Sequence, residues 1–520
     1  MRAVLRPAAS VLLAAVITMA QLAFAAPPDS TALDLSPPAA GSDLPDLGSP
    51  AAQMLSPTDE YRLGAMVAHE IREQNGLLED PEVNDYIQSV GVRLASQSAM
   101  GGAEFHYLVV KDDSINSFAV SGGWVFIFTG LIVAANTESE LAAVMAHETA
   151  HITQHHIARE MQAESRQSLA AAAAMLAAVL LGAIGGGPSG GNVTEAGIVA
   201  AQGLAIQSQI NFTREEEKEA DRVGIGYLAG ANFDPNAMAD MFETLGRSEG
   251  LLETYIPAML INHPVNSDRI AEARARAAQF PPRRGHDSLT FELIRERARV
   301  LTATGDVDMA AQYAQKIAQG DTSLGTRYGD GLALLQSNHA EEAAKIFAQL
   351  LAQHQNLTLL YDALGQAQAK AGHVSEALAT FQHADTLFPR NVPLTVRYAQ
   401  TLMAAGRPAQ AHLMLLDLFN VVPPTPDQIQ LTALAASAAG DPGDAYYYMG
   451  EYQLANGDPQ LAVQQYQLAL ASPRISSIQR QRFQARLDEI RDYLDSLHKP
   501  RLADQQQDQQ PSRRGGGGGR

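Results

Sequence analysis

Two histidines and a glutamate are spaced so that they can hold and use a divalent metal ion. Residues 142–151 read AAVMAHETAH and have helical character, with His147, Glu148 and His151 at the end of the run. Residues four apart share one face of an α-helix, so both imidazoles can reach the same ion. This spacing, with a glutamate after the first histidine, predicts a hydrolytic zinc site in which Glu148 takes a proton from water.

The segment before this motif has the features of a helix start. Thr137 is expected to be the N-cap, with Glu140 three residues on, as in a capping box. Apolar residues then follow at helical spacing: Leu141, Val144 and Met145. We therefore expect a partly buried helix, which suits a fixed metal site. A second His-Glu pair, His69 and Glu70, has Glu73 where the second histidine would be needed.

A catalytic zinc site needs a third protein ligand and one open position. The best candidates lie in residues 214–222, which read REEEKEADR. Glu217 and Asp221 are four apart, so Glu217 would bind the ion while Asp221 orients a histidine. Bare spacing leaves three rivals open: Glu215, Glu216 and Glu219. The alternative is that the whole run is a solvated acidic helix face.

Taken together, these segments resemble the HtpX-like and CAAX-prenyl-protease-like zinc peptidases, which are gluzincins. In that family the third ligand is the first Glu of a Glu-x-x-x-Asp segment, so the resemblance implies Glu217. It also extends to residues 116–119 (NSFA) and to His263-Pro264 with Arg269. The resemblance covers roughly residues 59–280 and implies a zincin-type α+β metalloprotease domain.

His263 has two possible roles that the sequence leaves open. It would either occupy the open zinc position as a fourth ligand and keep the enzyme latent, or donate a hydrogen bond to the oxyanion. The alternative is that His263 is a surface-loop histidine before Pro264, with no role in the site. Arg269 would either support the oxyanion or pair with an acidic neighbour. We expect His155 to miss the ion because it lies about 6 Å further along the helix axis, and His156 to face elsewhere.

Composition limits the possible classes of protein. The chain has 520 residues, 46% of them hydrophobic, enough for two or more domains. A net charge of −20 argues against nucleic-acid binding and against simple adhesion to anionic lipid. Residues 1–26 have the features of a cleaved secretory signal, and residues 27–58 of a disordered linker. The absence of cysteine excludes disulfides and lipidation through an N-terminal cysteine.

Elements other than the metal helix can also be predicted. Residues 105–110 and 124–128 are rich in β-branched and aromatic residues, so we expect two strands there, with a third at 117–120. A helix is expected from residue 81 to about 96. The edge of so small a sheet would bind an extended peptide through its backbone, with little sequence preference.

From about residue 286 a repeat appears with a period of 34, the length of a tetratricopeptide unit. Its columns are Gly331, Gly365 and Ala399; Ala343, Ala377 and Ala411; and Phe347, Phe381 and Leu415. Residues 286–497 are therefore expected to form an α-solenoid that binds peptides or partner proteins. The alternative is an unrelated helical bundle. Residues 498–520 are expected to be a disordered tail.

Residues 169–184 are apolar throughout, but sixteen residues fall short of the about twenty that span a bilayer. We expect a buried or membrane-dipping hairpin beside the active site, with peripheral membrane contact as one possible role. A true membrane span is the alternative.

The whole chain is similar to periplasmic zinc endopeptidases of Gram-negative bacteria that serve outer-membrane β-barrel assembly. The resemblance implies β-barrel precursors and their assembly machinery as partners, and degradation of misfolded or stalled proteins as the activity. A chaperone or assembly scaffold with a largely latent metal site is the competing hypothesis. A membrane-embedded prenyl-protein protease fits poorly, because it needs several long apolar spans.

Overall fold

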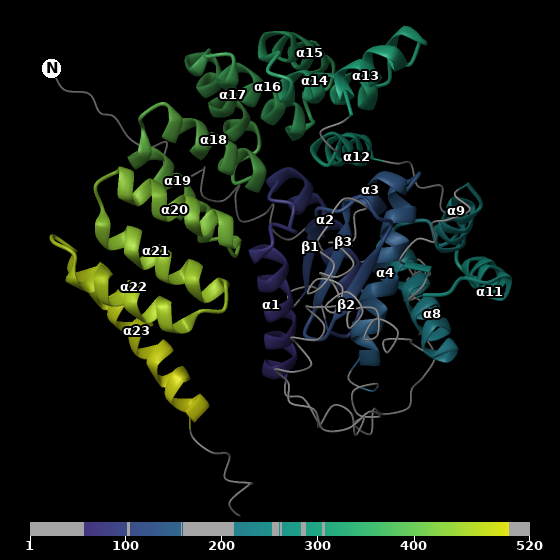
Figure 1. Cartoon of the computed structure of the whole chain (residues 1–520), viewed down its shortest axis with the longest axis horizontal. Helices are drawn as coiled ribbons and strands as arrows, with labels where there is room; N and C mark the ends of the chain where they lie inside the picture. Colours follow the sequence, from purple (N-terminus) through teal and green to yellow (C-terminus); the bar gives the residue numbers. More distant parts are fainter. Residues whose placement is uncertain are drawn as a thin grey trace, which may run out of the picture. The chain divides into compact units, whose positions relative to one another are not determined.

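The computed structural model describes residues 57–100, 105–157, 159, 213–251, 259–260, 263–281, 288–303 and 307–498. The described chain is mainly helical, with a small sheet in the first half and paired helices in the second (Figure 1). This confirms the predicted fold class of an α+β domain followed by tetratricopeptide-like repeats.

The sheet consists of strands β1 (His106–Val110), β2 (Ser117–Val120) and β3 (Trp124–Phe128), all three of which were predicted. Its order is β1-β3-β2, with β3 parallel to β1 and antiparallel to β2. All five residues of β3 are buried, as expected for an aromatic and β-branched central strand. Gly122 and Gly123 form the β2–β3 turn at φ 84° and 89°, a region that favours glycine.

Helix α4 (Glu138–Thr153) carries the His-Glu-x-x-His motif and lies in the middle of the core. It packs against α2 (Pro81–Ala95), α8 (Arg214–Gly230) and strand β2, an arrangement visible in Figure 1. Every residue from 139 to 152 is buried. Such complete burial fixes the direction in which each side chain of the motif points.

Close approach between α4 and α8 depends on a glycine. A Cβ atom at Gly224 would lie 3.2 Å from the carbonyl group of Ala146 and from the backbone nitrogen of His147. Those contacts are tighter than most real Cβ contacts, and the opposing atoms belong to backbone. The absence of a side chain at this position therefore sets how close α8 lies to the metal helix.

The other helices of the first half cover this core. They are α1 (Pro57–Glu73), α3 (Thr129–Ala134), α9 (Ala237–Leu251) and α11 (Ser267–Ala277). Helix α1 approaches the sheet closely, because a Cβ atom at Gly64 would overlap the ring of Trp124. Asp80 caps α2 by accepting a hydrogen bond from the Val83 backbone N–H.

The second half is a run of helices in which α12 packs on α14 and, from α13 on, each helix packs on the next. They are α12 (Leu289–Leu301), α13 (Met309–Ala318), α14 (Leu324–Gln336), α15 (Ala340–Gln353), α16 (Thr358–Lys370), α17 (Val374–Leu387), α18 (Val392–Ala404), α19 (Pro408–Phe419), α20 (Pro426–Ala438), α21 (Pro442–Ala455), α22 (Pro459–Ala471) and α23 (Ser477–His498).

Contacts within each helix pair explain the 34-residue columns. A Cβ atom at Gly331 would lie 2.6 Å from the ring of Phe347, and one at Gly365 would lie 2.4 Å from Phe381. Each glycine of the glycine column thus leaves room for a phenylalanine ring on the following helix. The alanine column, Ala343, Ala377 and Ala411, is fully buried. The predicted repeat is confirmed.

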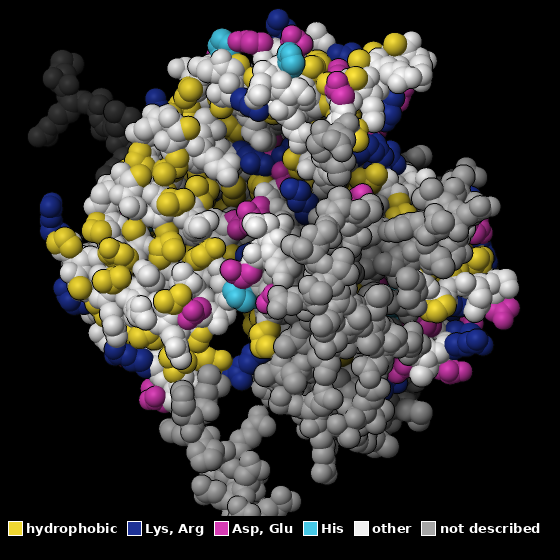
Figure 2. All heavy atoms as spheres, in the orientation of Figure 1, with side chains coloured by type: hydrophobic (Ala, Val, Ile, Leu, Met, Phe, Trp, Pro, Cys, Tyr) yellow, Lys and Arg dark blue, Asp and Glu magenta, His cyan; other side chains and the backbone are white. Residues whose placement is uncertain are grey.

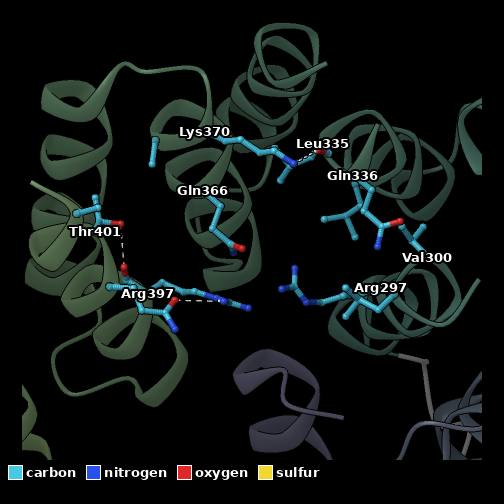
Figure 3. Close-up of a pocket in the computed structure, with 13 residues that line it drawn as sticks. Arg297, Val300, Leu335, Gln336, Gln366, Lys370, Arg397 and Thr401 are labelled. Atoms are coloured by element: carbon cyan, nitrogen blue, oxygen red, sulfur yellow. Dashed lines mark hydrogen bonds between the residues drawn. The ribbon is translucent and has the colours of Figure 1, made fainter. Parts of the chain in front are cut away.

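A buried ionic cluster joins the start of α2 to the repeats. Arg297 donates to both carboxylate oxygens of Asp80 at 2.7 Å, and Arg397 donates to those of Glu82 at 2.8 and 2.7 Å. The two guanidinium groups point toward one another at a cavity of about 430 Å³ (Figure 3). The start of α2 is therefore held to α12 and α18 at once.

Several predictions fall outside the described residues. These are the signal at 1–26, all but the last two residues of the linker at 27–58, the apolar stretch at 169–184 and nearly all of the tail at 498–520. Among the helices that the structure describes, none combines the length and apolar character needed to cross a membrane.

Candidate metal centre

Helix α4 begins as expected. The Thr137 side chain accepts a hydrogen bond from the Glu140 backbone N–H, while the Glu140 carboxylate accepts one from the Asn136 N–H at 2.9 Å. The reciprocal bond of this cap thus goes to the residue before the N-cap. With its start fixed, the helix presents His147 and His151 on one face, one and zero per cent exposed.

Helix α8 brings a carboxylate to the same point. A capping box between Thr213 and Glu216 starts the helix, and Glu217 follows, 3% exposed. The Nε2 atoms of His147 and His151 are 3.0 Å apart, and they lie 3.6 and 3.5 Å from Glu217 oxygens. Tetrahedral zinc with bonds of about 2.0–2.1 Å places its ligand atoms roughly 3.3 Å apart. The three donors fit one such ion.

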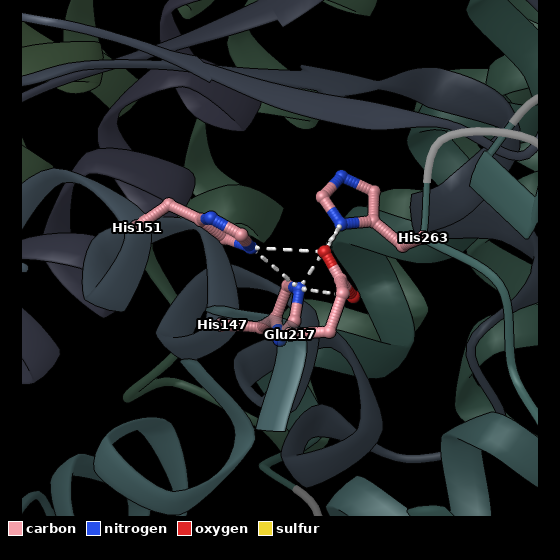
Figure 4. A group of neighbouring side chains, drawn as sticks. All are labelled: His147, His151, Glu217 and His263. Carbon is pink, nitrogen blue, oxygen red and sulfur yellow. Dashed lines mark hydrogen bonds and ion pairs between the residues drawn. The ribbon is translucent and has the colours of Figure 1, made fainter. Parts of the chain in front are cut away.

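His263 supplies a fourth donor to this group. Its Nδ1 lies 3.2 Å from His147 Nε2 and 2.8 Å from Glu217 Oε1 (Figure 4). Its Nε2 lies 3.7 Å from Glu148 Oε1. Donor atoms of His147, His151, Glu217 and His263 all lie within 4.8 Å of one another. Its burial, at 3% exposure, excludes the surface-loop alternative.

The charges in this cluster favour a cation. Burial lowers the pKa of His263, but the carboxylates of Glu217 and Glu148 outweigh it and raise that pKa to about 9. Burial raises the pKa of Glu217, yet the charge on His263 and hydrogen bonds from His151 and His263 hold it well below its usual value. Burial also holds the pKa of His151 well below its usual range, leaving a neutral ligand. A metal cation suits this environment.

Glu148 is held in a defined orientation by the edge strand of the sheet. Ser117, the first residue of β2, donates its hydroxyl proton to Glu148 Oε1 at 2.7 Å, and both side chains are buried. Among the residues that the structure describes, Glu148 Oε2 has no hydrogen-bond partner. The carboxylate therefore keeps one buried oxygen available for a proton. Ser117 lies in the segment 116–119 that resembles the family, but its role could not be predicted, because it depends on how β2 packs against α4.

Asp221 and Arg269 contact two of the four donor side chains. Asp221 Oδ1 lies 3.0 Å from His147 Nδ1, and Arg269 donates to both Asp221 oxygens at 2.8 Å. Arg269 also lies 2.8 Å from Glu217 Oε2 and donates to the Pro264 carbonyl at 2.8 Å. Of the two roles considered for Arg269, the geometry matches pairing with acidic neighbours.

The rival acidic residues point elsewhere. Glu216 is committed to the capping box with Thr213, and Glu215 is exposed. Glu219 lies 3.3 Å from His156 Nε2 and accepts a hydrogen bond from Arg159 at 3.1 Å. The structure brings only Glu217 of this run to the donor group.

His156 does not belong to the donor group, as predicted, but it does not face away from His151. Its Nδ1 lies 2.9 Å from Nδ1 of His151, and its side chain is fully buried. The prediction extended an ideal helix, whereas α4 ends at Thr153 and His155 adopts a left-handed φ of 54°. His155 itself does not belong to the donor group.

A His-Glu-x-x-His helix, a glutamate ligand from a second helix and a glutamate held beside them define a metallopeptidase of the gluzincin type. Residues 81–277 match the family model described as Peptidase family M48, and residues 368–437 match one described as Tetratricopeptide repeat. The chain belongs to peptidase family M48 and carries tetratricopeptide repeats.

Two bacterial relatives match this chain over most of their length. The chain is 33% identical over 454 residues to a putative beta-barrel assembly-enhancing protease of Vibrio cholerae, covering 86% of this chain and 92% of the relative. It is 28% identical over 463 residues to the beta-barrel assembly-enhancing protease of Escherichia coli, covering 88% and 93%. The mitochondrial metalloendopeptidase OMA1 of Schizosaccharomyces pombe is 30% identical over 196 residues, 36% of this chain and 50% of the relative.

Proposed function

We propose that this metallopeptidase is a zinc endopeptidase whose ion is held by His147, His151 and Glu217. The observation that carries the proposal is the convergence of these donors from two helices at 3.0 to 3.6 Å. Imidazole and carboxylate donors at this spacing suit zinc, with one ion per chain. Asp221 orients His147, and Arg269 holds Asp221 and Glu217 in place rather than touching the substrate.

Glu148 is the general base in this proposal. When bound, zinc supplies a Lewis acid and lowers the pKa of a water molecule at the site. Ser117 fixes Oε1 of Glu148, so that Oε2 accepts the proton of the attacking water and passes it to the leaving amine nitrogen. The edge strand β2, beside this carboxylate, is suited to bind an extended substrate through its backbone.

The Glu148→Gln variant tests this function. We expect it to bind zinc as the parent does and to cleave an unfolded protein substrate at least about a hundredfold more slowly, because the amide cannot accept the proton. Glu70→Gln, which alters the other His-Glu pair, should cleave at the parental rate. Cleavage by Glu148→Gln at the parental rate contradicts the role of Glu148.

His263 is proposed as a latch on the fourth ligand position. Its Nδ1 lies at hydrogen-bonding distance from both His147 and Glu217, where a fourth ligand would stand. The His263→Ala variant should therefore bind zinc through three residues and cleave protein several-fold faster than the parent. Loss of cleavage in this variant would instead assign His263 to the oxyanion.

For location and clients we propose the periplasm of a Gram-negative bacterium and misfolded or stalled outer-membrane β-barrel precursors. The names of the bacterial relatives support this, as does the secretory character of residues 1–26. The proposed organisation is a linker at 27–58, a metalloprotease domain at 59–280, a repeat domain at 286–497 and a tail at 498–520.

The repeats are proposed to bind clients or the β-barrel assembly machinery. Hydrophobic side chains gather on the face over α19 to α22 in Figure 2. Leu413 on α19 is 67% exposed and Leu434 on α20 is 56% exposed. Exposed apolar patches of this kind mark protein interaction sites.

A chaperone or assembly scaffold with a latent metal site is the second candidate. The position of His263 favours it, because a fourth protein ligand leaves no open position on a tetrahedral ion. An assay that follows both aggregation and cleavage of an unfolded protein, with and without chelator, separates the two. Suppression of aggregation without chelator-sensitive cleavage would favour the scaffold.

A further inference from the structure

Just beyond helix α4, the chain turns so that the ring of His156 contacts Nδ1 of His151, the ring nitrogen that does not face His147 and Glu217. Helix α4 ends at Thr153, and His155 adopts a left-handed φ of 54°. On an uninterrupted helix His156 would lie roughly 140° around the axis from His151. The left-handed residue instead directs the His156 ring against that of His151, where it is fully buried.

This contact continues to a carboxylate on α8. The Nδ1 atoms of His151 and His156 are 2.9 Å apart, and Nε2 of His156 lies 3.3 Å from Glu219 Oε2. Arg159 donates to the same Glu219 oxygen at 3.1 Å. The result is a chain of polar contacts that runs from a metal ligand to a partly exposed ion pair.

Metal binding fixes the direction of every proton in this chain. His151 turns its Nε2 toward His147 and Glu217, so that nitrogen must carry the lone pair and Nδ1 must carry the proton. His156 Nδ1 then accepts that proton's hydrogen bond, and His156 Nε2–H donates to Glu219. This arrangement of tautomers satisfies the contacts among His151, His156 and Glu219.

The other histidine ligand is supported from the same ring position. His147 Nδ1 lies 3.0 Å from the Asp221 carboxylate, which Arg269 holds in turn. Both ligands thus have a partner at Nδ1, one a carboxylate and one a second imidazole. Partners of this kind fix ligand orientation and strengthen the metal bond.

We propose that His156, backed by Glu219, is a positioning residue that fixes the tautomer and ring orientation of His151. His156 does not belong to the donor group, so it acts through His151 rather than as a ligand. The inference rests on the proposed zinc site and adds a residue to it. The left-handed backbone at His155, unfavourable for a residue with a Cβ atom, is consistent with a need to place the next ring here.

Zinc affinity of the full-length chain, measured by competition with a chromophoric chelator, tests this directly. His156→Phe keeps a planar ring but removes the acceptor, so we expect a zinc Kd about ten- to a hundredfold above that of the parent. His156→Asn retains a side-chain oxygen that can accept from His151, and should recover most of the lost affinity. The visible absorption of the cobalt-loaded forms should change for His156→Phe, because the ligand geometry changes.

A gentler variant covers the case in which His156→Phe fails to fold. Glu219 is partly exposed, and Glu219→Gln keeps an oxygen for His156 while removing the negative charge. We expect it to weaken zinc binding by less than about tenfold, because it lies one contact further from the ion. Glu215→Gln makes the same chemical change on the same helix at an exposed position and should leave the Kd unchanged.

The outcomes separate this inference from the proposed function. A parent chain that binds zinc and cleaves protein, with an unchanged Kd and cobalt spectrum in folded His156→Phe, overturns the positioning role and leaves the zinc peptidase intact. If His156→Phe does not fold, an unchanged Kd in Glu219→Gln has the same meaning. A parent chain that binds no zinc contradicts the proposed function itself.

Discussion

Asp221 accepts a hydrogen bond from His147 and two from Arg269, so its carboxylate is occupied without approaching the metal position. Burial raises the pKa of Asp221, but these hydrogen bonds outweigh it and hold that pKa below its usual value of 3.8. The side chain therefore remains anionic at neutral pH. A buried anion at Nδ1 makes His147 a stronger ligand and fixes its ring.

Replacing Asp221 with asparagine should show the contribution of this charge. The amide keeps the size of the side chain but loses the anion that faces His147 and Arg269. We expect the zinc Kd of Asp221→Asn to rise about ten- to a hundredfold, measured by chelator competition. Asp240→Asn, at an ion pair with Arg274 on the surface, is the control and should bind zinc as the parent does. Equal Kd values for the two variants would show that Asp221 does not support the site.

At this scale, the sequence could predict what depends on one helix and not what depends on packing. His147, Glu148 and His151 follow from helical spacing alone. Glu217 could be selected among its neighbours only through a family resemblance, because the contacts that engage Glu216 and Glu219 elsewhere depend on the folded structure. Ser117 lies in a segment that resembles the family, yet its role could not be predicted, since its contact with Glu148 forms only when β2 packs against α4.

At the scale of elements, the spacing between α4 and α8 determines whether the ligands meet. Gly224 faces the backbone of Ala146 and His147, whereas a Cβ atom at Gly226 would meet nothing within 4 Å. Both glycines lie in the interior of the same helix, where alanine is intrinsically more favourable by about 0.5–1 kcal/mol. The two positions therefore form a matched pair.

Alanine at these two positions should have opposite effects. Gly226→Ala should stabilise the protein slightly and leave the zinc Kd unchanged. Gly224→Ala should push α8 from α4 by a few tenths of an ångström and destabilise the protein by about 1–3 kcal/mol. It should also weaken zinc binding, because Glu217 lies on the displaced helix. Thermal unfolding and chelator competition measure both, and equal behaviour of the two variants would refute the close-packing argument.

The strands and the repeats were predictable because their patterns are local. A 34-residue period repeats the same small-to-aromatic contact, as between Gly365 and Phe381, within one helix pair. The turn at Gly122 and Gly123 is also a local pattern, because it lies directly between two runs of strand-forming residues. The contact of His156 with His151 could not be predicted, because a single left-handed residue, His155, redirects the chain without an obvious sequence signal.

At the scale of the whole molecule, the contact between α2 and the repeats joins residues more than 200 positions apart, such as Asp80 and Arg297. No local sequence pattern predicts such a pair. Its bidentate geometry and burial make both partners interdependent, because removing one leaves an uncompensated buried charge. Helix α2 also packs on α4, so the repeats are held to an element that contacts the metal helix.

Asp362 on α16 faces this cluster and gives it a pH dependence. The side chain is fully buried, and neither carboxylate oxygen has a hydrogen-bond partner among the described residues. Burial, and after it the charges of Glu82 and Asp80, raise the pKa of Asp362 well above its usual value of 3.8. The charges of Arg397 and Arg297 lower that pKa but do not outweigh this effect. At pH values between the unfolded-state and folded-state pKa, Asp362 therefore keeps its proton in the folded protein and loses it in the unfolded chain.

The sign of the effect follows from proton linkage. Because the folded state binds more protons, the contribution of Asp362 to the unfolding free energy is retained below about pH 4 and decreases as pH rises through the folded-state pKa. Asp362→Asn removes this titration. We expect the variant to be more stable than the parent at pH 8, by about 1 kcal/mol or more, with a smaller difference at pH 4. Thermal unfolding at both pH values tests this, and a variant less stable than the parent at pH 8 would contradict it.

Zinc-edge anomalous diffraction from crystals of the full chain tests the central claim most directly. We predict one strong anomalous peak per chain, within bonding distance of His147 Nε2, His151 Nε2 and a Glu217 oxygen, and loss of that peak in His147→Ala. A zinc-loaded crystal with no peak between these three side chains, or with its peak at another site, would contradict the account.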